Sequence, residues 1–146
     1  MATYTRLAAV VVVAVLGLSG CSLLGPARDA DGRVTEPADI RSTALTVGDC
    51  FSFIDGTNLT EATVTPCDRE HTHIVIGQDD LTDSAIDSAG GLQNAVSAAC
   101  AEPFAAFKEQ AAEGTKPEQE FIVSPIEVDG EKLTRFFCIA TDAAAG

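Results

Sequence analysis

The segment CDREHTH, residues 67–73, holds the densest group of side chains that could do chemistry. It contains the only two histidines of the chain, His71 and His73, two residues apart. On one strand they would share a face, and together with Asp68 or Glu70 they could chelate a transition metal. We therefore treat Asp68, His71 and His73 as possible binding or metal-ligating residues.

Two other interpretations of this segment stay open. It can be a polar loop that enters a strand and binds nothing, or an edge whose imidazole groups respond to the pH outside the cell. For a binding protein, we expect the edge that carries His71 and His73, together with a turn at residues 55–58, to belong to the contact surface, because recognition residues concentrate in loops on rigid scaffolds.

Motifs that would indicate an enzyme are missing from the sequence. There is no Gly-x-Ser-x-Gly, no His-Glu-x-x-His, no phosphate-binding glycine loop and no dinucleotide fingerprint. The acidic run at residues 79–87 lacks the central glycine and the final glutamate of a calcium loop. We predict a non-catalytic binding protein without a cofactor. The alternatives are a metal-binding or hydrolytic enzyme that uses His71 and His73, and a purely structural envelope protein.

The N-terminus is typical of an exported protein. A polar start with one cation, Arg6, is followed by an apolar run at residues 7–18 that is shorter than the roughly 20 residues of a membrane span. The next residues, LSGC at 18–21, resemble the lipobox of bacterial lipoproteins. The resemblance implies cleavage before Cys21 and diacylation of its thiol, and two acyl chains give stable anchoring. We expect the mature protein on the extracytoplasmic face of the cell membrane, held there by its lipid.

Charge and aromatic content narrow the choice of partner. After removal of Arg6 with the signal peptide, eight basic residues would face 22 acidic ones, a net charge of −14 that repels nucleic acid. The chain has no tryptophan, and its only tyrosine, Tyr4, lies in the signal peptide, which weakens a carbohydrate-binding role. We predict a protein of the cell envelope as the partner.

Four cysteines remain after Cys21, at positions 50, 67, 100 and 138. Export makes two disulfides the natural expectation, and four cysteines allow three pairings. We favour Cys50 with Cys67 and Cys100 with Cys138, since each pair would tie neighbouring elements together. No Cys-x-x-Cys pair occurs, which argues against redox chemistry.

The hydrophobic pattern predicts one small α+β domain, a small antiparallel sheet with one helix on one face. Apolar residues at helical spacing begin at Leu92, and Pro103 within that run either kinks the helix or starts a second one. Strands are predicted at residues 44–54, 60–67, 71–77, 121–126 and 132–140. The domain limits that we predict are 1–20 for the signal peptide, 21–42 for the lipidated cysteine and a flexible tether, 43–142 for the folded domain, and 143–146 for a tail.

The chain also resembles the septum formation domain family of Gram-positive actinobacterial surface proteins. The resemblance rests on LTVGDCF (45–51), VTPCDREHTHIV (64–75), AVSAACAEPFAAF (95–107) and SPIEVDGEKLTRFFC (124–138). It implies an envelope location, an association with cell division and a partner in the envelope or the division machinery. It supplies no catalytic residues.

Overall fold

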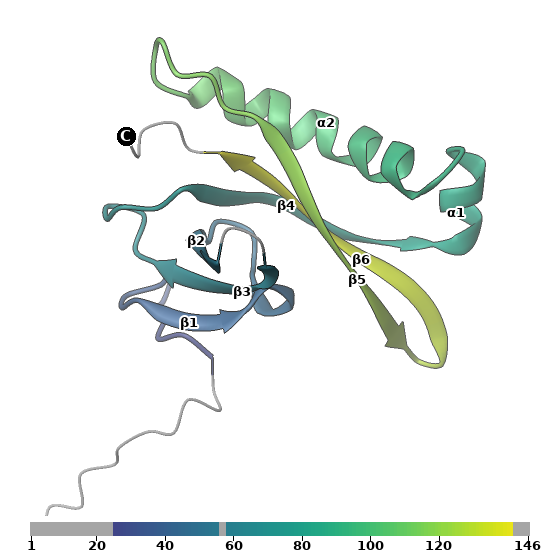
Figure 1. The fold of residues 1–146 in the computed structure, drawn as a ribbon, viewed down its shortest axis with the longest axis horizontal. Coiled ribbons are helices and arrows are strands. Elements are labelled where there is room, and N and C mark those ends of the chain that lie inside the picture. Colours follow the sequence, from purple (N-terminus) through teal and green to yellow (C-terminus); the bar gives the residue numbers. More distant parts are fainter. Residues whose placement is uncertain (1–24, 56–57, 142–146) are drawn as a thin grey trace, which may run out of the picture.

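The computed structural model describes residues 25–55 and 58–141, and within them it forms one six-stranded sheet and one long helix (Figure 1). Neighbouring strands are antiparallel, in the order β1-β3-β2-β4-β6-β5. The elements are β1 (Ala38–Arg41), a 3₁₀ turn (Ser42–Ala44), β2 (Cys50–Asp55), β3 (Asn58–Thr65), β4 (His73–Thr82), α1 (Asp83–Ser88), α2 (Leu92–Gln110), β5 (Gln119–Val128) and β6 (Glu131–Thr141).

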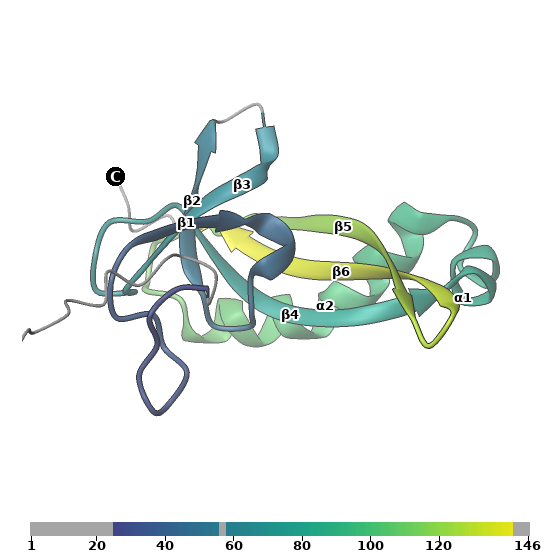
Figure 2. The same ribbon diagram turned by 90° about the horizontal axis from the view of Figure 1, so that it is seen from below.

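Strand β6, which lies between β4 and β5, divides the apolar residues into two cores. Side chains alternate between the two faces of a strand, so Phe137 and Ile139 point to one face while Phe136 and Cys138 point to the other. The first face is covered by β1, β2 and β3, which lie at one end of the longer strands (Figure 2). The second face is covered by α2, which contacts β4, β5 and β6. Its buried residues are Val96, Cys100, Phe136 and Cys138.

The helix α2 runs through Pro103 as one element, so the proline does not start a second helix. The Pro103 ring packs against β4 at Gly77, and a Cβ added to Gly77 would lie 3.2 Å from Pro103 Cγ. Gly77 follows a register shift between Val75 and Gly77. A glycine within a strand often marks a place where another segment approaches the backbone closely. Gly77 has this role and does not end the strand, so β4 continues to Thr82, beyond the predicted end at residue 77.

The structure confirms the α+β class and both favoured disulfides. Cys50 is bonded to Cys67, which ties β2 to the segment after β3, and Cys100 is bonded to Cys138, which ties α2 to β6. The predicted helical stripe is buried at Val96 and Cys100.

The fold begins earlier than the predicted boundary at residue 43. Residues 38–41 of the predicted tether form β1, which pairs with β3, and Ala38 and Ile40 pack against the first core. Val34 is buried in the same core. The composition of this segment suggested a tether because charged residues and Pro37 separate its few apolar side chains, and only the neighbouring strand β3 gives them a surface to cover.

The acidic run at residues 79–87 has a structural use. Asp80 pairs with Arg135 of β6, and the hydroxyl of Thr82 accepts a hydrogen bond from the Ala85 amide at the start of α1, a short helix that the sequence analysis did not predict.

Cys21, the predicted signal peptide (1–20) and the predicted tail (143–146) lie outside the described residues. Within the described part of the chain, no helix combines the length and the apolar character needed to cross a bilayer.

Candidate functional site

A groove of about 620 Å³ crosses the surface beside the first disulfide. Three segments form it: residues 29–34, residues 47–50 before and at the start of β2, and residues 65–68 after β3. We call it the disulfide groove, and we call residues 25–37 the arm. The charged residues that line the disulfide groove are Asp29, Asp31, Arg33, Asp49 and Asp68.

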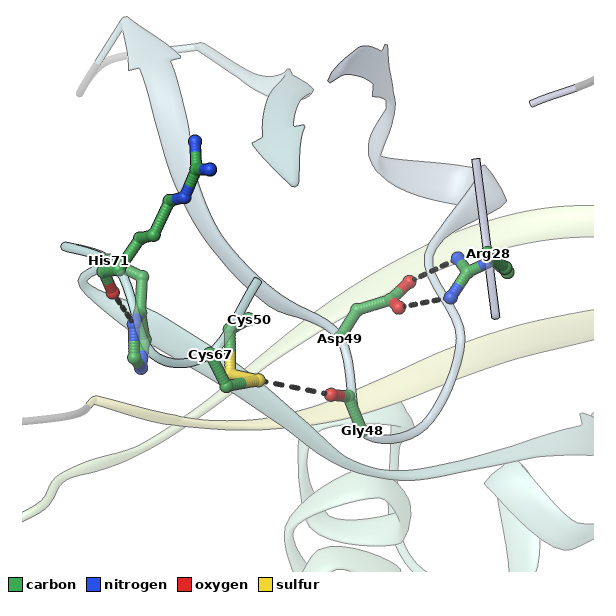
Figure 3. The surroundings of a disulfide bond; sticks show 7 residues. Arg28, Gly48, Asp49, Cys50, Cys67 and His71 are labelled. Carbon is green, nitrogen blue, oxygen red and sulfur yellow. Dashed lines mark hydrogen bonds and ion pairs between the residues drawn. A yellow bond between two sulfur atoms is a disulfide. The ribbon is translucent and has the colours of Figure 1, made fainter. Parts of the chain in front are cut away.

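The arm is fixed to the groove by an ion pair (Figure 3). Arg28 donates from both terminal guanidinium nitrogens to the two carboxylate oxygens of Asp49, at 2.6 and 2.8 Å. The carboxylate also accepts hydrogen bonds from the backbone amide and the hydroxyl of Thr46, at 2.8 and 3.1 Å. The hydrogen bond to Asp49 raises the pKa of Arg28 despite partial burial. The side chain of Asp49 is 2% exposed and that of Arg28 is 23% exposed, so this pair holds the arm through a partly buried contact.

The disulfide forms another part of the groove. Cys50 is buried, whereas Cys67 is exposed. Cys67 Sγ lies 3.6 Å from the carbonyl oxygen of Gly48, as Figure 3 shows. The Cys50–Cys67 disulfide therefore holds residues 65–68 against the turn that carries Asp49.

The structure places Asp68, His71 and His73 in three different environments. Asp68 is exposed in the disulfide groove. His71 is 8% exposed, and its Nδ1 lies 2.7 Å from the carbonyl oxygen of Arg69, the geometry of a ring N–H donating to that oxygen (Figure 3). The prediction that both histidines lie on one strand is wrong, because β4 begins at His73. In residues 25–55 and 58–141, no group of three or more His, Cys, Asp or Glu side chains is arranged to hold a metal ion.

His73 lies in an aromatic and hydroxyl cluster. Its ring stacks on Phe51 at 5.3 Å and meets Phe53 edge-on at 5.0 Å between ring centroids. Nδ1 lies 2.6 Å from the hydroxyl of Thr72, and Nε2 lies 3.5 Å from a carboxylate oxygen of Glu120. A proton on Nε2 satisfies both contacts, since Nδ1 then accepts from the hydroxyl.

A second hydroxyl extends this cluster. Ser52 Oγ accepts a hydrogen bond from the Thr72 amide at 3.1 Å and lies 3.2 Å from the Thr72 hydroxyl. A hydroxyl beside a neutral imidazole that is oriented by a carboxylate is the arrangement that activates nucleophiles in hydrolases. Here the two phenylalanine rings cover the imidazole, whose side chain is only 15% exposed, and both of its nitrogens already have partners.

This environment makes the stability of the protein depend on pH. Burial lowers the pKa of His73 below its ordinary value of 6.5, and the nearby charge of Glu120 opposes that effect only in part. Below pH 6.5 the unfolded chain binds a proton at His73 that the folded chain takes up only at lower pH, so His73 contributes its full stability above pH 6.5 and progressively less below it. We expect the urea midpoint to fall between pH 7.5 and pH 5.0, and to fall less in His73→Gln. An equal fall in both proteins would show that other groups cause the acid sensitivity.

Arg28, Asp49 and the arm are not among the site residues that the sequence predicts. Arg28 and Asp49 are 21 residues apart in the chain, and no local pattern connects them. The predicted contact turn at residues 55–58 lies partly outside the described residues, because positions 56 and 57 are not described.

The site therefore consists of a groove held by a disulfide and an ion pair, with a packed histidine cluster on the neighbouring strands. No protein-family model, curated protein or solved structure matches this chain.

Proposed function

We propose that this protein is a non-catalytic binding module on the extracytoplasmic face of the cell membrane, anchored by lipid at Cys21. The apolar run and the LSGC segment support the anchor and the location. The resemblance to the septum formation domain family supports a partner in cell division or in the envelope.

The disulfide groove is the observation that carries this proposal. Three separate segments of the chain meet there, and a disulfide and a partly buried ion pair hold them in place. A site that is formed before its ligand arrives avoids the entropy cost of ordering loops during binding. The covered ring of His73 favours binding over catalysis, because the imidazole serves packing and two hydrogen bonds.

Site-specific photo-crosslinking in dividing cells tests the proposal. Val47 lines the groove and is 57% exposed, so a photoreactive amino acid there should capture a discrete envelope or division protein. Ala105 is exposed on α2, outside the groove lining, and should give no such adduct. Cys21→Ala should remove the Val47 adduct, because the unanchored chain loses its place at the membrane.

Four results would contradict the proposal. The same adduct from Ala105 would mean that the groove is not the contact surface. The absence of an adduct from Val47 would mean the same. An adduct that persists in Cys21→Ala would argue against the lipid anchor. Hydrolysis of an ester by the purified full chain, lost in Thr72→Val, would favour the enzyme alternative instead.

A further inference from the structure

The outer edge of β5 is open within the described part of the chain. Its only strand partner there is β6, and β5 is the last strand of the sheet on that side. β5 spans ten residues, which is long for an edge strand, and a long open edge can pair with another extended chain.

The register with β6 shows which backbone groups face outward. The Thr141 amide donates to the Glu118 carbonyl at 3.0 Å, so 118 and 141 form a hydrogen-bonded pair. In an antiparallel ladder such pairs recur at every second residue, so the even-numbered residues of β5 bond to β6. The amides and carbonyls of Gln119, Phe121 and Val123 therefore point away from the sheet.

Pro125 is consistent with this alternation of inward and outward backbone groups, and it limits the open edge. It is odd-numbered, so the N–H that proline lacks would have faced outward, the one orientation at which a strand tolerates proline. Its carbonyl lies 3.5 Å from the Ser124 hydroxyl. The edge that offers both donors and acceptors is therefore residues 119–123.

The side chains along this edge indicate the chemistry of a partner. On one face lie Glu120, whose side chain is 47% exposed, and Glu118, exposed just before the strand. On the other face lie Phe121, packed against the α2 core, and Val123, which is 36% exposed. Cross-strand neighbours favour opposite charges and matched apolar side chains. A strand that alternates basic and apolar residues would place its cations beside the glutamates and its apolar side chains beside Val123.

We propose that residues 119–123 form a docking edge for an extended segment of another protein in which basic and apolar residues alternate. A second copy of this chain is disfavoured as the occupant, because each copy carries a net charge of −13 and would bring its own glutamates to the contact. The chain's own undescribed ends do not fit either, since residues 1–24 contain one basic residue, Arg6, and residues 142–146 contain none. This edge is separate from the disulfide groove and adds a second contact to the proposed function.

A peptide of eight alternating valine and lysine residues is the probe. We expect it to bind the full-length chain in detergent and to slow hydrogen exchange at the Phe121 and Val123 amides. A peptide of the same composition, with four valines followed by four lysines, should bind weakly and protect neither amide. Binding of the alternating peptide should weaken as salt increases, because the glutamates and lysines attract through solvent.

Two variants test the backbone and the charge separately. Val123→Pro removes an outward N–H without removing a bond to β6 and should weaken binding about tenfold, while Val123→Thr keeps the N–H and should bind normally. Glu118→Lys leaves the backbone intact and should also weaken binding, so the charge is tested even if Val123→Pro fails to fold.

Other outcomes would overturn the proposal. Equal binding of both peptides, or unchanged binding in Val123→Pro with its native circular dichroism spectrum, would indicate general attraction to an acidic surface. Protection at residues 29–34 or 65–68 would place the peptide in the disulfide groove. Protection of residues 119–123 that rises with protein concentration in the absence of peptide would identify a second copy as the occupant. The Val47 crosslink does not depend on residue 123, so failure of this proposal leaves the groove proposal separately testable.

Discussion

Replacing both Cys100 and Cys138 with alanine should lower the free energy of unfolding by about 4 kcal/mol, the value that the chain-entropy model gives for a closed loop of this length. The two cysteines are 38 residues apart and connect α2 to β6. Both are buried, at 0% and 1% exposure, and with Val96 and Phe136 they form the buried core under the helix. A domain of this size is stable by about 5 to 15 kcal/mol, so the loss is a large part of the total. Urea unfolding of the full-length chain in detergent, followed by circular dichroism, measures it.

The other disulfide provides the matched comparison. Cys50 and Cys67 are 17 residues apart, so the same model gives about 3 kcal/mol for the Cys50→Ala and Cys67→Ala double variant. That variant should also weaken the Val47 crosslink, since residues 65–68 would no longer be held at the groove. A loss of less than about 1 kcal/mol in the Cys100 and Cys138 variant would show that the helix core does not depend on its disulfide.

Asp49→Ala should lower the free energy of unfolding by about 3 kcal/mol, at the low end of the range for breaking a buried ion pair. The substitution leaves Arg28 without its carboxylate, and it removes the acceptor of the Thr46 amide and hydroxyl. The low end applies because the Arg28 side chain is 23% exposed and keeps some contact with water. Urea unfolding measures the loss, and the Val47 crosslink should disappear because the arm is no longer fixed beside the groove.

Asp80→Ala is the matched control for this prediction. Arg135 also binds Asp80 through two hydrogen bonds, at 2.8 and 2.9 Å, but the two side chains are 33% and 26% exposed. Water screens that pair, so its loss should cost less than about 1 kcal/mol and leave the crosslink unchanged. Equal losses in Asp49→Ala and Asp80→Ala would mean that burial does not determine the strength of these ion pairs.

Local patterns predicted most of the sheet and the helix. The apolar spacing from Leu92 predicts α2, and Val96 and Cys100 are buried as that spacing requires. The two favoured cysteine pairs are confirmed, but four cysteines allow three pairings, and only the structure selects between them. The end of β4 was misjudged at Gly77, because a glycine that ends a strand and a glycine that makes room for Pro103 look the same in a sequence.

The candidate site was predicted much less well. Their spacing in the sequence groups Asp68, His71 and His73, but β4 begins at His73, so the strand period does not apply to His71. The residues that hold the disulfide groove, Arg28 and Asp49, come from a segment that looked like a tether and from a bend before β2.

By itself, the sequence determined the α+β class, the helix and most of the strands, because these depend on side-chain periodicity and on neighbours along the chain. Only the tertiary structure decided that the arm belongs to the fold, that a groove forms beside Cys67 and that β5 lies at an open edge. These features depend on contacts between distant segments: the chain encodes an ion pair such as Arg28 with Asp49, but the pair exists only after strand order and register bring the two residues together.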